Sequence, residues 1–304
     1  MIFSEIIQRV CAKNMSNKKK IAITTDSNSG FSNDIPDGVF VLPMPCLIND
    51  QDYFEGINLS YEEFYKLLEN DATISTSQPS IGNLTEFWTD ILKEYDEIIH
   101  IPMSSGLSQS CATAENLAKE FNGRVYVVDN HRVSITLKES VYDALKLREQ
   151  GKSSAQIKEY LLSTSADSAI YIAVDTMKYL KKGGRVTPAA AMISSILKVK
   201  PVLQIHGEKL DRYTVARGAI KAREALKEAL KKELTTTFAK YTEKGEMCVS
   251  VAYTDNLAEA EKFIEEFKTL MPNIPLHFTD PLPLSVSCHI GPGALGVSCA
   301  RFMK

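Results

Sequence analysis

The stretch Glu97–Asp129, EIIHIPMSSGLSQSCATAENLAKEFNGRVYVVD, decides the fold class. EIIHIPM favours a strand, LSQSCATAENLAKEF favours a helix, and RVYVVD favours a second strand. Two strands joined by a helix normally pair in parallel, with the helix covering one face of their sheet. The stretch therefore predicts an α/β fold built on a parallel sheet.

The same alternation extends on both sides of this stretch. KIAITTDS and VFVLPMPCLI read as extended runs, and a helix is expected from about Val133 to Gln150. Ser60 with Glu63, and Ser153 with Gln156, have the spacing of helix capping boxes. Ser80 can cap a further helix whose apolar positions include Leu84, Phe87, Trp88, Ile91 and Leu92. These elements predict a parallel sheet covered on both faces.

The pattern changes after about residue 165. AIYIAVDT reads as a strand, MKYLKKGGR as a short helix stopped by Gly183 and Gly184, and VTPAAAMISSILK as a helix. KPVLQIHGEKLDRYTVAR favours two antiparallel strands, followed by a helix over about 219–240. MCVSVAYT, a helix near Leu257 to Leu270 and PLHFTD continue the α/β pattern. The final LSVSCHIGPGALGVSCARFM reads as strand, glycine-rich loop and strand.

These patterns predict two domains. We expect an N-terminal extension over 1–20, a parallel-sheet α/β domain over 21–166, and an α/β domain with antiparallel elements over 167–304. The charge that follows the apolar start of the extension is the reverse of a secretory signal, and Met15 could be an alternative start.

Composition limits the function classes. Apolar residues make up 44% and charged residues 24% of the 304 residues, values typical of a soluble globular protein. The net charge of −3 argues against nucleic-acid binding, and no apolar run is long enough to span a membrane. Six cysteines without CxxC spacing predict reduced, mostly buried thiols and a cytoplasmic location.

Hydroxyl-rich and glycine-rich turns are the candidate site, because ligands of parallel α/β sheets collect where strands end. In TTDSNSG, Asp26 could serve a ligand or only form an Asx-turn or helix cap. In MSSGLSQS, the hydroxyls of Ser104, Ser105 and Ser108 beside Gly106 could bind an anion or only cap a helix. The hydroxyls of STSQPSIGNL, Ser75–Leu84, could likewise bind an anion or only cap a helix.

Three further candidates lie in the second half. His289 precedes the Gly-Pro-Gly of CHIGPGALG, where the backbone can approach a ligand closely. Arg185 follows the double glycine of KKGGR, and Arg217 stands in VARG; either could be a solvated charge. His100, His131, His206 and His277 show no metal-ligand spacing, and no phosphate loop or other cofactor motif is present, so neither metal nor cofactor is expected.

Seven motifs in order resemble the DegV family of bacterial fatty acid-binding proteins. They are IAITTDSNSGF, STSQPSIGNL, IHIPMSSGLSQS, VVDN, YLKKGGRVT, KVKPVLQI and HIGPGALG, and the resemblance runs from about Lys20 to the C-terminus. It implies a two-domain α/β protein that buries one long-chain fatty acid between its domains. It also implies a carrier subunit without catalytic activity, which presents the fatty acid carboxylate to a separate ATP-dependent kinase and so supplies acyl phosphate for phospholipid synthesis.

The resemblance also implies residue roles. Thr76, Ser108 and His289 match the family's carboxylate-binding positions, with Arg185 and the serine-rich turn in support, and Arg217 matches an arginine implicated in the kinase partnership. Hydroxyls hold a carboxylate more weakly than a bidentate arginine would, so an oxygen stays nucleophilic. Runs such as AAAMISSIL and ALGVSCARF could line the acyl tunnel or simply pack the core.

Two other functions remain open from the residues alone. A serine hydrolase or acyltransferase could use Ser108, His289 and Asp26, although the spacing of a nucleophile elbow is missing. A binder of a small molecule or sugar phosphate would need a polar pocket instead of an apolar one.

Overall fold

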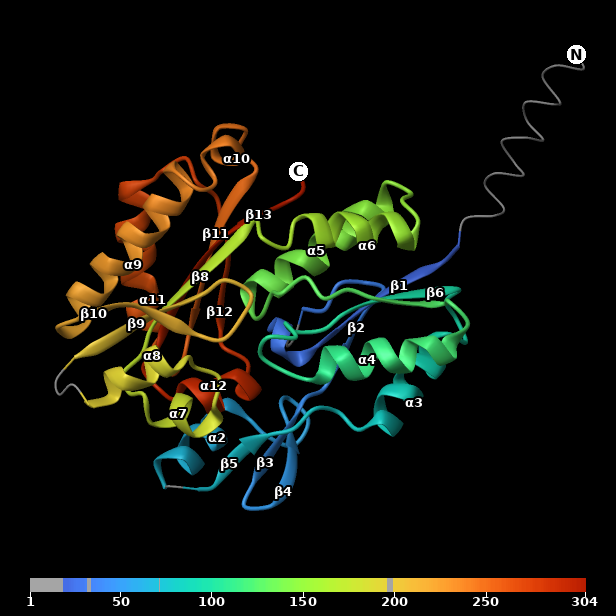
Figure 1. Ribbon diagram of the computed structural model, residues 1–304, viewed down its shortest axis with the longest axis horizontal. Coiled ribbons are helices and arrows are strands. Elements are labelled where there is room, and N and C mark those ends of the chain that lie inside the picture. The colour runs from blue at the N-terminus through green and yellow to red at the C-terminus, as the bar shows by residue number, and fades with distance from the viewer. Residues whose placement is uncertain (1–18, 32–33, 71, 196–198) are drawn as a thin grey trace, which may run out of the picture.

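A computed structural model describes residues 19–31, 34–70, 72–195 and 199–304, with the side chains of residues 194–195 left out. Figure 1 shows a four-stranded and a six-stranded sheet beside each other, with a small three-stranded sheet below them. The mixed α/β architecture and the two-domain arrangement are confirmed. The boundary near residue 167 stays a prediction, and most of the predicted N-terminal extension, residues 1–18, lies outside the described residues.

The four-stranded sheet has the order β2-β1-β6-β7 and is parallel throughout, as predicted. Alternate residues of β1 and β6 enter two different cores, because side chains on a strand alternate between the faces of a sheet. Its strands are β1 (Ile21–Asp26), β2 (Val39–Leu42), β6 (Glu97–Ile101) and β7 (Val125–Val127). Its helices are α3 (Ile81–Ile91) and α4 (Ser110–Ala118) on one face and α5 (Ile135–Glu149) and α6 (Ser154–Ser163) on the other.

The six-stranded sheet is mixed, in the order β10-β9-β8-β13-β11-β12, and only β11 and β12 pair in parallel. Its strands are β8 (Ser168–Ala173), β9 (Lys200–Ile205), β10 (Asp211–Ala216), β11 (Met247–Tyr253), β12 (Leu276–Pro281) and β13 (Leu295–Arg301). Helices α9 (Gly218–Thr235) and α11 (Leu257–Leu270) cover its outer face. The helix predicted over 219–240 is interrupted, and α10 (Ala239–Glu243) follows as a separate element.

The small sheet was not predicted. It consists of β3 (Pro45–Ile48), β4 (Gln51–Phe54) and β5 (Ile74–Thr76), with α2 (Tyr61–Glu69) packed on it. The capping boxes at Ser60 and Ser153 and the cap at Ser80 are confirmed. The capping side chains fold back onto backbone N–H groups that a helix start leaves unpaired.

The strand predicted at LSVSCHI is wrong: Leu284–Ile290 forms the helix α12. Its apolar residues alternate with polar ones, which mimics a half-buried strand. In the folded chain Leu284 and Cys288, four residues apart, pack on the small sheet, while Ile290 joins the central core. A helix places residues four apart on one face, so packing on two sides overrides the local pattern.

Two short helices follow β8 along the chain. They are α7 (Lys178–Gly183), which ends at the predicted Gly184, and α8 (Pro188–Ala191), which begins at the predicted Pro188 but is shorter than expected. Among the described residues, no helix is long and apolar enough to cross a membrane.

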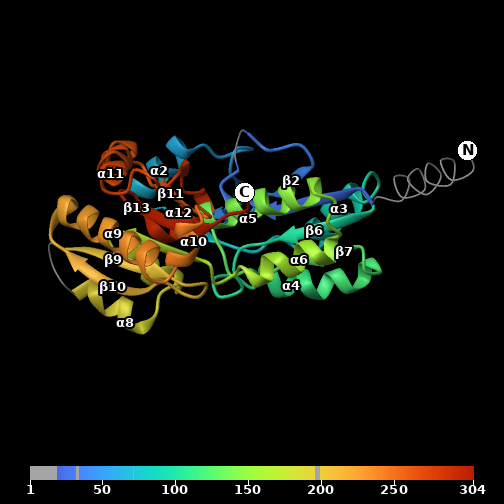
Figure 2. The ribbon, with the colours of Figure 1, turned by 90° about the horizontal axis from the view of Figure 1, so that it is seen from above.

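The central core joins the two large sheets. Ile23 and Ile101 of the parallel sheet share one apolar cluster with Ile170 and Leu203 of the six-stranded sheet. Figure 2 shows the two sheets side by side, with α5 and α12 at their junction. The space between the sheets is therefore walled by apolar side chains from both domains.

Gly106 sets how closely the two domains approach. A Cβ atom there would lie 2.8 Å from the Glu208 Cα and 2.8 Å from the Gly207 carbonyl oxygen, both at the turn between β9 and β10. We expect Gly106→Ala to lower the free energy of unfolding by about 1–3 kcal/mol, because backbone on both sides must move. Urea unfolding measures this change.

Gly82→Ala is the matched control. Its Cβ would meet only the Ser80 Oγ at 3.7 Å, within α3. It should leave stability unchanged or raise it by up to about 1 kcal/mol, since alanine favours a helix over glycine. Equal effects of the two substitutions would contradict the close interdomain contact at Gly106.

Candidate ligand-binding site

A cavity lies between the two sheets. It encloses about 900 Å³ of empty space, counting solvent at its opening. Most of its walls are apolar. The apolar lining residues include Met44, Met103, Leu107, Val133, Ile135, Ile170, Ile172, Leu180, Ile205, Leu210, Ala252, Leu282, Val286 and Ile290. This lining suits a long hydrocarbon and disfavours the polar ligand of a sugar-phosphate binder.

The cavity sits where parallel-sheet sites are expected. The chain passes from β1 to β2 on one side and then to β6 on the other side of β1, so the strand order switches between β1 and β6. Ligands bind at such switch points, beyond the carboxyl ends of the strands. Asn28 after β1, Met103 after β6 and Val133 after β7 all line the cavity.

Thr76 and His289 meet at the polar wall of this cavity. The Thr76 Oγ1 and the His289 Nε2 share a hydrogen bond of 2.8 Å, although the residues are 213 positions apart. Thr76 ends β5, and His289 stands in the last turn of α12. The packing of α12 on the small sheet therefore brings together two of the predicted carboxylate-binding residues.

Gly183 makes room for His289, and Gly291 makes room for Tyr179. A Cβ on Gly183 would overlap the His289 ring, and one on Gly291 would overlap the Tyr179 ring. Gly291 also has φ of 84°, a conformation that L side chains rarely adopt. Gly183 at the end of α7 and Gly291 just after α12 thus allow these two helices to pack closely.

Arg185 brings a positive charge to the same wall. Its Nη1 donates to the Gly183 carbonyl oxygen at 2.6 Å, and it lines the cavity together with Thr76 and His289. Burial, with a smaller contribution from Arg185, lowers the pKa of His289 to about 4. His289 is therefore neutral at pH 7. Arg185, predicted as a supporting residue, thus lines the same cavity as Thr76 and His289.

The residues of the serine-rich turn have two different roles, since some line the cavity and others do not. Ser108 lines the cavity, and its Oγ accepts a hydrogen bond from the Ser110 N–H at 3.1 Å. Ser104, Ser105 and Gly106 are not among the lining residues. The Ser104 hydroxyl instead donates to the Gly207 carbonyl oxygen of the other domain. In the described structure Ser104 and Gly106 contact the other domain, whereas the Ser105 N–H donates to Asp129 within its own domain.

Two other predicted residues lie away from the cavity lining. Asp26 is buried and forms the helix cap considered in the sequence analysis, accepting hydrogen bonds from the N–H groups of Asn28 and Met103. Arg217 is exposed at the start of α9. Among residues of the runs AAAMISSIL and ALGVSCARF whose side chains are described, only Gly296 lines the cavity.

The residues of the hydrolase alternative do not form a hydrogen-bonded triad. His289 pairs with Thr76 through Nε2, Ser108 accepts from Ser110, and both Asp26 carboxylate oxygens are used within the first domain. Within the described part of the chain, no hydrogen bond joins Ser108 to His289. A serine nucleophile needs such a base within reach.

Sequence reasoning missed a second polar group on the cavity wall. The Ser285 hydroxyl donates to the Asn28 Oδ1 at 2.7 Å, across the domain junction. Ser134, with φ of 54°, donates its N–H to the Asn28 carbonyl oxygen. Gln78 also lines the cavity, and its place in the motif STSQPSIGNL was a signal that could have found it. Asn28 stands in the candidate turn TTDSNSG, but nothing in the sequence indicated its contact with Ser285, since only the fold brings them together.

A second cavity adjoins the first. Thr76, Arg185 and His289 line both, so these three residues form the wall between them. The second cavity is also lined by Lys178 and Lys182 of α7 and by Tyr179. An acid group held at this wall would therefore be reachable from a basic compartment next to the apolar one.

Comparison with known proteins identifies the family. A family profile described as "Uncharacterised protein, DegV family" matches residues 20–301. The chain belongs to the DegV family. The protein named DegV of Bacillus subtilis is 29% identical over 285 residues, covering 91% of this chain and 98% of that relative. A DegV domain-containing protein of Deinococcus radiodurans is 30% identical over 288 residues, covering 91% of this chain and 97% of that relative.

Solved DegV-family structures share this fold. A protein from Thermus thermophilus, described as a fatty acid-binding DegV family protein, has a TM-score of 0.82 and 27% identity, covering 93% of this chain and 100% of its own. DegV of Bacillus subtilis, described as a fatty acid-binding protein, has a TM-score of 0.79 and 26% identity, covering 93% and 99%. DegV-family homologues thus bind fatty acids.

The lowered pKa of His289 predicts a loss of stability in acid for this DegV-family protein. An unfolded histidine takes up its proton near pH 6.5 and folded His289 near pH 4, so stability falls as pH drops from 6.5 toward 4. Between pH 7 and pH 5 this effect is about 2 kcal/mol.

His289→Gln, neutral at every pH, should remove that part of the loss. Urea unfolding of delipidated protein at pH 7 and pH 5 measures it. His100, also buried with its pKa lowered to about 3, contributes equally to both proteins and cancels. An identical loss in both proteins would mean that His289 is not held neutral by burial.

Proposed function

We propose that this protein binds one long-chain fatty acid in the cavity between its two sheets. The supporting observation is a mostly apolar cavity with Thr76, Ser108 and His289 beside Arg185 in its lining. An acyl chain would occupy the apolar part, and its carboxylate would meet this wall. Membership of the DegV family adds the precedent of homologues that bind fatty acids.

The energetics of the tail favour tight binding. Burying about 15 methylene groups at about 0.8 kcal/mol each yields on the order of 10 kcal/mol. Association and ordering remove a large part of this. The remainder is compatible with submicromolar affinity, which requires about 8 kcal/mol.

The head group explains the choice of side chains. Neutral His289 and Thr76 share one hydrogen bond, in which one of them donates and the other accepts. The accepting residue keeps its own proton and can donate it to a carboxylate. Arg185 offsets the carboxylate charge while its Nη1 is engaged by the Gly183 carbonyl oxygen. One carboxylate oxygen can then stay available toward the second cavity.

We propose further that this carboxylate is phosphorylated by a separate ATP-dependent kinase, yielding acyl phosphate for phospholipid synthesis. The protein itself would be a non-catalytic carrier in the cytoplasm. A carboxylate oxygen would attack the γ-phosphorus of ATP and release ADP. The second cavity, with Lys178 and Lys182 in its wall, offers positive charge where phosphate would arrive. The exposed Arg217 is the proposed kinase contact.

The head-group contact is tested by isosteric removal of hydroxyls. We expect Thr76→Val and Ser108→Ala each to weaken fatty acid binding by about tenfold or more, since a hydrogen bond to a charged group contributes about 1.5–3 kcal/mol. Titration of delipidated protein measures the dissociation constants. Thr85→Val on α3, outside both cavities, is the control and should bind normally.

A fatty alcohol of the same length sharpens this test. It keeps the tail but lacks the negative charge, so Thr76→Val should weaken its binding much less than that of the acid. Equal weakening of both ligands would show that Thr76 acts on the fold and not on the carboxylate. Unchanged acid binding in both variants would refute the proposed head-group site.

The kinase contact is tested separately with Arg217→Ala. We expect unchanged fatty acid binding, but about a tenfold loss in kcat/KM for the loaded protein as substrate of a bacterial fatty acid kinase, because surface charges steer association. Arg212→Ala is the control, since Arg212 is exposed on the neighbouring strand β10. A normal rate with Arg217→Ala, or an equal loss with both variants, would reject Arg217 as the contact.

A further inference from the structure

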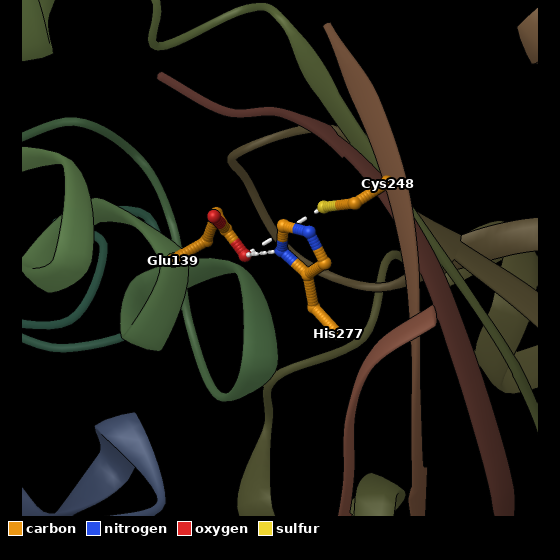
Figure 3. A group of neighbouring side chains, drawn as sticks. All are labelled: Glu139, Cys248 and His277. Carbon is orange, nitrogen blue, oxygen red and sulfur yellow. Dashed lines mark hydrogen bonds and ion pairs between the residues drawn. The ribbon is translucent and has the colours of Figure 1, made fainter. Parts of the chain in front are cut away.

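A cluster of three metal-ligating side chains lies outside the fatty acid site. Glu139 comes from α5, Cys248 from β11 and His277 from β12, and Figure 3 shows their polar atoms turned toward one another. One ligand atom from each lies within 4.8 Å of the other two. Glu139 belongs to the parallel-sheet half of the chain, whereas Cys248 and His277 belong to the six-stranded sheet.

The spacing of these atoms fits a tetrahedral zinc site. With Zn–S of about 2.3 Å and Zn–O or Zn–N of about 2.0 Å, tetrahedral angles place sulfur about 3.5 Å from oxygen and nitrogen about 3.3 Å from oxygen. The Cys248 Sγ lies 3.6 Å from the Glu139 Oε2, and the His277 Nδ1 lies 2.9 Å from the same oxygen. Of these two separations, the first already fits and the second must widen by a few tenths of an ångström, while the sulfur and the imidazole nitrogen lie within 4.8 Å of each other.

The surroundings provide charge balance and outer hydrogen-bonding groups. Asp143, one turn after Glu139 on α5, and Arg132 are both buried beside the cluster and interact with Glu139 through their charges. Among the residues that the structure describes, the Asp143 Oδ2 and the Arg132 Nε have no hydrogen-bond partner. Unpaired buried polar atoms are rare, and next to a metal they are suited to hold a bound water.

The cluster is also accessible. The Cys248 thiol and the Glu139 carboxylate are buried, but the His277 side chain keeps 24% of its surface exposed. An ion can therefore reach the cluster from the His277 side. Thiolate, imidazole and carboxylate together form a ligand set of the kind that zinc takes, whereas magnesium and calcium prefer oxygen alone.

We propose that Glu139, Cys248 and His277 bind one Zn²⁺ ion, with a water molecule as the fourth ligand. The ion would join α5 to β11 and β12 and so fasten the two domains to each other. The sequence showed no metal spacing, because the cysteine and the histidine lie 109 and 138 positions from Glu139. The site stands apart from the fatty acid cavity, since none of the three residues lines it.

Binding must release a proton. The Cys248 thiol gives up its proton to solvent as the Zn–S bond forms, and the imidazole and the carboxylate bind through lone pairs. Burial, together with the Glu139 charge, raises the pKa of the Cys248 thiol well above its ordinary value of 9.0. Zn²⁺ binding at this site should weaken in acid, where protons compete with the ion for its ligands.

Co²⁺ is the probe that separates this site from surface binding. We expect the full-length, chelator-treated protein to bind one Co²⁺ per chain with a thiolate charge-transfer band in the near ultraviolet, which Zn²⁺ abolishes by displacing it. Cys248→Ala should lose the band. His277→Gln, a change at a partly exposed residue, should keep the fold and weaken binding at least tenfold. Thermal unfolding in the presence of Zn²⁺ should shift upward in the wild type and not in Cys248→Ala.

Cys299→Ala is the matched control. Cys299 is equally buried, on the strand β13 that pairs with β11, and is not part of the cluster. It should keep the band and the thermal shift. No band in the wild type, a band that persists in Cys248→Ala, or unchanged affinity in His277→Gln would each overturn the proposal, and would mean that the three residues form only a hydrogen-bonded cluster.

Discussion

The hydrogen bond between Thr76 and His289 is the contact on which the ligand site depends. It joins the last residue of β5 to α12, and so ties a small sheet early in the chain to a helix near its end. The closeness of α7 and α12 follows from glycine at 183 and 291, where any side chain would overlap a ring. Without that close packing, Arg185, Thr76 and His289 would not share one wall between two cavities.

Burial determines the chemistry of that wall. His289 is held neutral with its pKa lowered to about 4, so Arg185 is the permanent charge among the three residues that separate the cavities. One cation opposite one carboxylate balances charge, while the hydroxyl and the imidazole supply neutral hydrogen bonds. In the proposed function, such an arrangement would retain a fatty acid through its tail and hold its head group less tightly than a cluster of arginines would.

The sequence predicted the parallel sheet well, because its signals are local. The helix caps and the strands between them depend on neighbouring residues alone. The caps are Ser60, Ser80 and Ser153, and the strands are rich in β-branched residues. The prediction for α12 was wrong because its conformation depends on distant residues. Its alternating residues favour a strand, and only packing against both the small sheet and the central core makes it a helix.

The site was partly predictable for similar reasons. Thr76, Ser108, Arg185 and His289 were found through motifs, and the structure places all four on one cavity. Asn28 and Ser285 were missed because their hydrogen bond joins residues 257 positions apart. Ser104 and Gly106 were expected to support the ligand, but hydroxyls and glycines also serve close interdomain contacts, and their residue types do not distinguish the two uses.

We propose that the cavity between the sheets binds a fatty acid. The most direct measurement is organic extraction of the purified full-length protein, followed by mass spectrometry of the extract and quantification against protein. We expect the extract to contain about one long-chain fatty acid per protein chain. An extract without fatty acid, together with no uptake of added fatty acid by the delipidated protein, would contradict it.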